Sequence, residues 1–272
     1  MGRRSLLAAV AATTAALLPA CTATGQPDPD TPVTEIGVAA GVSLSGVFTE
    51  LAEEFEAENP GTRVRLELGR SVDLARGLGE RDDIHVFAAT GQTAMGIAVD
   101  AGAAAAPRVF ARNLVVLAVP AGNHAAVERL ADLARPELRV GLCIVDGACG
   151  RASAALLAAA AVGADVDERV SDSPTLTERL AGNTLDAGIV FRTDVAASRG
   201  WVEEVHAEDV AGLRARLPDV GITDYLLADG PAAQGESAGD AELEAAAAFR
   251  DLVASDRGRR ALVEAGFVPL GE

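Results

Sequence analysis

The chain has 272 residues, of which 49% are hydrophobic and 23% charged, and its formal net charge at pH 7 is −17. This length is enough for one large domain or two smaller lobes with a sizeable core. Every basic residue is an arginine, and the acidic excess argues against a nucleic-acid-binding protein, which needs a basic face. It does not exclude a small anion as ligand, because distant charges are screened within about 10 Å and backbone dipoles can hold an anion.

Residues 1–20 have the pattern of a lipoprotein signal peptide. Arg3 and Arg4 form a short basic segment, and the apolar run Ser5–Leu18 follows. This run is shorter than the roughly 20 apolar residues of a membrane-spanning helix. It ends in the tetrapeptide LPAC, which resembles the lipobox of bacterial lipoproteins, a family in which the cysteine is acylated. The resemblance implies an extracytoplasmic protein tethered to the membrane by lipidated Cys21, and ordinary secretion of a soluble product is the alternative.

Residues 21–33 are predicted to serve as lipid anchor and linker. The segment TATGQPDPDTP is polar and rich in proline and aspartate, which is typical of a flexible spacer.

The rest of the chain alternates short apolar strands with amphipathic helices, which predicts an α/β fold. The run NLVVLAVP is apolar throughout, as in a strand that is covered on both faces. Strands are predicted at Glu35–Ala40, Arg63–Leu68, Ile84–Ala88, Val109–Pro120, Leu138–Ile144, Arg169–Ser171, Ala187–Phe191 and Gly221–Leu227. Helices are predicted at Ser43–Glu58, Val72–Gly79, Val127–Leu133, Gly150–Ala161, Ser173–Ala181, Glu242–Ala254 and Asp256–Ala265, with a surface loop at Ala228–Asp240.

The chain has three cysteines, and the assignment of Cys21 to a lipid leaves Cys143 and Cys149. In an oxidising compartment two remaining cysteines suggest a disulfide. Its short loop would contribute roughly 2–3 kcal/mol to the free energy of unfolding. Two free thiols, one in a strand and one in a loop, are the alternative.

Four predicted strand-to-helix turns carry Ser or Gly: residues 41–43, 69–71, 148–150 and 173–174. The beginning of a helix presents unpaired N–H groups and a partial positive charge. Such ends gather at the carboxyl edge of an α/β sheet, where several of them can hold an anion. Any one of these serines could equally be a simple helix cap.

Several segments resemble the molybdate-binding proteins of bacterial molybdate transporters, from about Glu35 to Pro269. They read VAAGVSL, GRSVDLARGL, VFARNLVVLAVPAGN, LCIVDGACGRA, DAGIVFRTDVAAS and AFRDLVASDRGRRALVEAGFVP. The resemblance implies a periplasmic-binding-protein type II fold, in which two α/β lobes joined by a hinge close on a tetrahedral oxyanion. It places lobe 1 at residues 34–116 plus 226–272 and lobe 2 at residues 117–225.

The resemblance also implies an anion site made of residues from both lobes. Ser43 and Ser71 would donate hydroxyl and backbone bonds, and Cys149 and Ser173 would each donate a backbone N–H. Some members of the family carry a cysteine pair near this loop, which favours a disulfide between Cys143 and Cys149.

Two positions depart from the family pattern. The family usually has tyrosine where this chain has Phe191, which cannot donate a hydrogen bond to the anion. Loss of one donor to a buried charged oxygen costs roughly 1–3 kcal/mol. The strand near Ile84 is also altered, since it reads DDIHVF with His85 among its apolar residues.

The resemblance implies molybdate or tungstate as ligand, no cofactor, and an ABC permease with its ATPase as partners of a monomeric protein. One alternative is an enzyme with a Cys149 thiolate at the beginning of a helix, although no cysteine–histidine signature supports it. A cation site has little support, because the three histidines have no metal-ligand spacing. A further alternative, motivated by Phe191, is a relative that binds another anion or small ligand, or that acts as a partner-binding lipoprotein.

Overall fold

The structure, a computed structural model, describes residues 33–235 and 238–270. The predicted signal peptide, Cys21 and the linker up to residue 32 lie outside the described residues. None of the described helices is long and apolar enough to cross a membrane.

The strands of the described chain form one mixed sheet in the order β2-β1-β3-β9-β4-β7-β5-β6, with β8 beside β4. Strands β1, β2 and β3 are parallel to one another, as are β5, β6 and β7, whereas β4 and β9 run antiparallel to their neighbours. The strands are β1 (Thr34–Gly41), β2 (Thr62–Gly69), β3 (Val86–Thr90), β4 (Ala105–Pro120), β5 (Val140–Cys143), β6 (Glu168–Val170), β7 (Ala187–Phe191), β8 (Val202–Glu204) and β9 (Ile222–Asp229).

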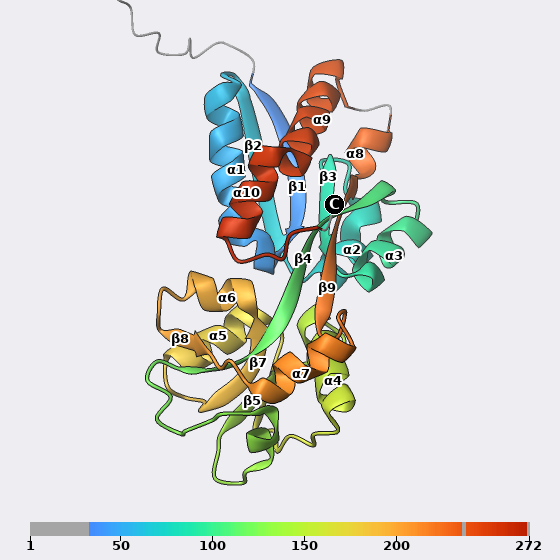
Figure 1. Ribbon diagram of the computed structural model, residues 1–272. Coiled ribbons are helices and arrows are strands. Elements are labelled where there is room, and N and C mark those ends of the chain that lie inside the picture. Colours follow the sequence, from blue (N-terminus) through green and yellow to red (C-terminus); the bar gives the residue numbers. More distant parts are fainter. Residues whose placement is uncertain (1–32, 236–237, 271–272) are drawn as a thin grey trace, which may run out of the picture. The chain divides into compact units, whose positions relative to one another are not determined.

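Helices cover the sheet and connect its strands (Figure 1). The α-helices are α1 (Ser45–Glu58), α2 (Ser71–Gly77), α3 (Gln92–Asp100), α4 (Ala148–Ala160), α5 (Ser173–Ala181), α6 (Arg192–Ala197), α7 (Glu208–Arg216), α8 (Pro231–Gln234), α9 (Asp240–Ala254) and α10 (Asp256–Glu264). Short 3₁₀ turns are η1 (Val42–Leu44), η2 (Leu78–Glu80) and η3 (Leu130–Ala134).

The fold has two α/β lobes, as the family resemblance implies, and each lobe has its own core. In the first lobe Val38 and Ala40 of β1 pack in one buried cluster with residues of α1, α9 and α10, while Ala39 packs in another with residues of α2 and α3. This alternation is the period of a strand covered on both faces. In the second lobe a single buried cluster joins the carboxyl half of β4 to β5, β7, α4 and α5.

Strand β4 belongs to both lobes. Its first part, up to Leu114, pairs with β9, and its last part, from Val115 onward, pairs with β7 and β8. At the change of partner the Val115 N–H donates to the Gly221 carbonyl at 2.9 Å, just before β9 begins. Gly221 has a φ of +73°, which a side chain would strain. The two connections between the lobes therefore lie side by side.

Several elements were not predicted, or were predicted wrongly. The predicted helix at Val127–Leu133 is instead the 3₁₀ turn η3, and the predicted loop at Ala228–Asp240 holds the end of β9 and helix α8. The elements α3, α6, β8 and α7 had no prediction. Helix α7 has a weak apolar pattern because Val210 and Leu213 are its buried residues, with charged side chains around them.

The predicted disulfide between Cys143 and Cys149 is confirmed. Cys143 ends β5, Cys149 lies in the first turn of α4, and their Cα atoms are 5.9 Å apart. The bond closes the turn that connects these two elements.

Replacement of both cysteines by serine is expected to lower the free energy of unfolding by about 2 kcal/mol, because the unfolded chain loses a short covalent loop. Urea unfolding of the wild type and the double variant measures this difference. Equal stability of the two proteins would show that the bond does not constrain the unfolded chain.

Candidate functional site

A small cavity of about 50 Å³ lies at the carboxyl ends of strands from both lobes. All of the residues predicted to bind the anion line it together: Ser43, Ser71, Cys149, Ser173 and Phe191. The first two follow β1 and β2 of the first lobe, and the others belong to α4, α5 and β7 of the second. Such strand ends are where open α/β sheets bind ligands.

The Ser71 hydroxyl is positioned by a hydrogen bond from the protein backbone. Its oxygen accepts the backbone N–H of Thr90 at 2.9 Å, and no acceptor for its hydrogen is present among the described residues. Gly41 makes this approach possible, because a Cβ there would lie 2.6 Å from the Ser71 hydroxyl oxygen and 2.2 Å from that of Thr90. The hydrogen of Ser71 is thus free to donate into the cavity.

The Ser43 hydroxyl is in a similar position. Its oxygen lies 2.8 Å from the hydroxyl of Tyr225 and 3.2 Å from that of Thr90. Tyr225 is fully buried, and the Asn113 side chain donates to its oxygen at 3.5 Å. A buried hydroxyl hydrogen without an acceptor is costly, so Tyr225 donates to Ser43 rather than the reverse. Burial also raises the pKa of Tyr225, which keeps this donor protonated.

Ser173 uses its hydroxyl inside the protein. The oxygen accepts the Phe191 N–H at 2.8 Å, and its hydrogen goes to the carboxylate of Asp194. Burial raises the pKa of Asp194 to about 7, although the Ser173 bond opposes this shift. The Ser173 side chain therefore has no hydrogen left for a ligand while Asp194 is ionised.

Two backbone donors complete the site. Cys149 is the second residue of α4, where the N–H has no acceptor within the helix. In α5 the Asp172 side chain accepts the N–H of Thr175 at 2.9 Å, and Pro174 has no N–H. The N–H of Ser173 is therefore the unpaired donor at that end of α5.

Arg70 and Asp172 are the charged side chains among the described residues that line the cavity. Arg70 precedes Ser71 and reaches across to Asp146 of the second lobe, with 2.6 Å between its Nη2 and the Asp146 Oδ1. The pKa of Asp172 lies below its usual value despite the opposing effect of burial, because hydrogen bonds from Ser171 and Thr175 favour the charged form.

Sequence reasoning missed Thr90, Tyr225, Asp194 and Arg70. Tyr225 is the one tyrosine of the chain, and a buried tyrosine normally has a partner for its hydroxyl, which was the available signal. No local pattern connects it with Ser43, because the two positions are 182 residues apart.

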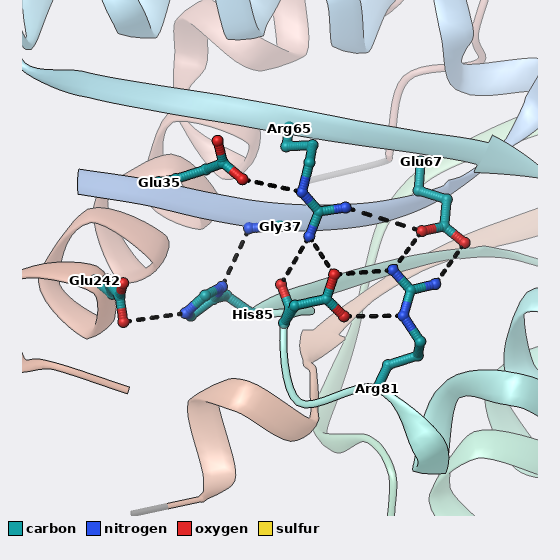
Figure 2. Close-up of polar contacts among 8 residues, drawn as sticks. Glu35, Gly37, Arg65, Glu67, Arg81, His85 and Glu242 are labelled. Carbon is teal, nitrogen blue, oxygen red and sulfur yellow. Dashed lines mark hydrogen bonds and ion pairs between the residues drawn. The ribbon is translucent and has the colours of Figure 1, made fainter. Parts of the chain in front are cut away.

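His85 does not line the cavity, and its contacts in the first lobe are shown in Figure 2. Its Nδ1 accepts the Gly37 N–H at 3.1 Å, and its Nε2 is 3.8 Å from the carboxylate of Glu242. Burial lowers its pKa, so the ring is neutral at pH 7. Arg65 and Arg81 form ion pairs with the Glu67 carboxylate in the same region. Cys149, the nucleophile of the enzyme alternative, has no thiol because it is in the disulfide.

Comparison with known proteins agrees with this geometry. A family model described as bacterial extracellular solute-binding protein matches residues 36–268. The molybdate-binding protein ModA of Mycobacterium tuberculosis is 33% identical over 180 residues, which cover 65% of this chain and 69% of that protein. The chain therefore belongs to the bacterial extracellular solute-binding proteins, and among them to the family of the molybdate-binding proteins ModA.

Solved structures share the fold at lower identity. The periplasmic molybdate-binding protein of Azotobacter vinelandii has a TM-score of 0.69 and 16% identity, over 87% of this chain and 100% of that one. The sulfate-binding protein SubI of Mycobacterium tuberculosis has a TM-score of 0.70 and 18% identity, over 87% of each chain.

The raised pKa of Asp194 predicts a pH-dependent stability. Its value is about 7 in the folded protein and near 3.8 in the unfolded chain, so the stability that it contributes is complete below pH 3.8 and is lost as the pH rises to about 7. Between pH 5 and pH 8 the wild type should lose about 3 kcal/mol relative to the variant Asp194→Asn.

Urea unfolding of both proteins at these two pH values measures this difference. Parallel pH profiles would show that Asp194 titrates normally.

Proposed function

We propose that this chain is an extracytoplasmic solute-binding protein that captures a tetrahedral oxyanion, molybdate or tungstate, and delivers it to an ABC permease driven by an ATPase. The observation that carries the proposal is the convergence of Ser43, Ser71, Cys149 and Ser173, from both lobes, on one small cavity. The hydroxyls of Ser43 and Ser71 and the N–H groups of Cys149 and Ser173 are the donors that the described residues can offer, and an anion with four oxygens is a complementary partner.

The size of the cavity supports a small ion. A single water needs roughly 10–15 Å³ by this measure, so a volume of about 50 Å³ gives room for roughly four oxygen atoms. A sugar or a peptide would need a pocket several times larger. Charge and shape are alike for molybdate, tungstate and sulfate, so cavity size would separate molybdate and tungstate from the smaller sulfate.

Tyr225 compensates for the phenylalanine at position 191. The rings of Phe191 and Tyr225 are neighbours, with 6.3 Å between their centroids. A tyrosine at 191 would bring a hydroxyl to the anion directly, whereas Tyr225 stands behind Ser43 and orients its hydrogen. Tyr225 is therefore a positioning residue for the anion.

Closure of the lobes is the step that couples binding to transport. Donors from both lobes share the anion, so the closed form is favoured when the anion is bound. The hinge is proposed where β4 changes partner between Leu114 and Val115, next to Gly221, with the lobes on either side near the predicted boundaries. The lipid on Cys21 would keep the protein close to its permease, and the chain would work as a monomer.

Titration calorimetry of the chain from Thr22 onward tests the ligand. We expect molybdate and tungstate to bind more tightly than sulfate and phosphate, since the cavity would fit the larger ions. If none of the four anions binds with a dissociation constant below about 1 mM, transport of these anions is not the function of this chain. The better hypothesis is then that it binds another ligand.

Removal of the Tyr225 hydroxyl tests the positioning role. Tyr225→Phe is expected to weaken molybdate binding about tenfold, because Ser43 loses the bond that orients its hydrogen. Phe191→Tyr should tighten binding by adding a direct donor, and it should also rescue Tyr225→Phe.

Calorimetry of the two single variants and the double variant gives these values, and thermal unfolding checks that each folds. An unchanged affinity in Tyr225→Phe would remove the role of this hydroxyl, and an unchanged affinity in Phe191→Tyr would mean that the anion does not reach position 191.

A further inference from the structure

Arg70 brings a positive charge to a cavity that is surrounded by acidic groups. Asp172 lines the cavity, Asp194 lies behind Ser173, and Asp73 and Asp146 face Arg70 itself. Each of these carboxylates, when ionised, repels a dianion from the site. Arg70 is the only cation among the described residues that line the cavity.

Two of the three guanidinium nitrogens of Arg70 make hydrogen bonds among the described residues. Its Nη1 donates to Asp73 at 3.0 Å and its Nη2 to Asp146 at 2.6 Å. Its Nε is buried and has no partner among the described residues. A buried guanidinium N–H without an acceptor is costly, and a dianion in the cavity that Arg70 lines would offset this cost through its charge.

The two carboxylates that pair with Arg70 come from different lobes. Asp73 lies in the first turn of α2, directly after Ser71 and Val72. Asp146 lies in the turn closed by the Cys143–Cys149 disulfide, and the side chain of Arg151 donates to its carbonyl oxygen. The guanidinium is therefore positioned from both lobes, and its side chain is 23% exposed, which limits screening by solvent.

We propose that Arg70 is a specificity-determining residue that selects dianions over monoanions of the same shape, through the positive charge that it brings to the cavity wall. This inference rests on the proposed function, because it assigns a role at the same anion site. It adds a selection by charge to the selection by size. Backbone and hydroxyl donors also bind the more highly charged anion more strongly, and Arg70 adds to this preference.

Tungstate and perrhenate are the probes, since both are tetrahedral and nearly equal in size, but tungstate is a dianion and perrhenate a monoanion. Calorimetry of the wild type should show tungstate bound at least about tenfold more tightly than perrhenate. Arg70→Gln should reduce this ratio about tenfold, chiefly by weakening tungstate. Arg70→Lys keeps the charge and should retain most of the ratio.

Arg76→Gln is the matched control. Arg76 lies in the same helix and is within 3.5 Å of the same Asp73 carboxylate, but it does not line the cavity. Its removal lowers the net charge by the same amount and should leave both affinities within about twofold of the wild type.

The outcomes separate the two claims. If the wild type binds tungstate but does not prefer it to perrhenate, or if Arg70→Gln weakens both anions equally or neither, the role of Arg70 is wrong while the proposed function stands. If the wild type binds neither anion, the proposed function fails and the role of Arg70 fails with it. A wild type without a preference for tungstate overturns the role of Arg70 even if Arg70→Gln does not fold.

Discussion

A hydroxyl has a single hydrogen, and the direction of that hydrogen governs what this cavity can bind. The Ser71 oxygen accepts the Thr90 N–H, and the Ser43 oxygen is hydrogen-bonded to the buried Tyr225 hydroxyl. Both serine oxygens therefore already have a partner within the protein. Ser173 accepts from Phe191 and gives its hydrogen to Asp194, which leaves its backbone N–H as the donor. The site presents hydrogen-bond donors, while its hydroxyl oxygens already have partners within the protein. Such a site favours an anion that carries no protons.

The rest of the fold brings these donors together. Parallel strands end at the same edge of the sheet in each lobe, and the helices that follow begin there with unpaired N–H groups. Strand β4 passes through both lobes and keeps the two edges facing each other. The disulfide fixes the turn that carries Asp146 and leads to Cys149, so one covalent bond supports both a backbone donor and the partner of Arg70.

The sequence predicted the parts of this arrangement that follow from local pattern. The alternation of strands and helices, the turns at Ser43, Ser71 and Ser173, and the resemblance of motifs predicted the fold and the residues that line the cavity. Tyr225 and Asp194 were beyond such reasoning, because their partners lie 182 and 21 residues away in the chain. Helix α7 escaped prediction since its charged residues obscure a narrow apolar face.

The central claim is that one tetrahedral oxyanion is held by donors from both lobes. The most direct test is a crystal structure of the protein grown with tungstate, in which the anomalous scattering of tungsten locates the ion. The account predicts one strong peak in the cavity, with anion oxygens at hydrogen-bond distance from the hydroxyls of Ser43 and Ser71 and from the N–H groups of Cys149 and Ser173. A peak at any other place, or contacts from one lobe alone, would contradict it.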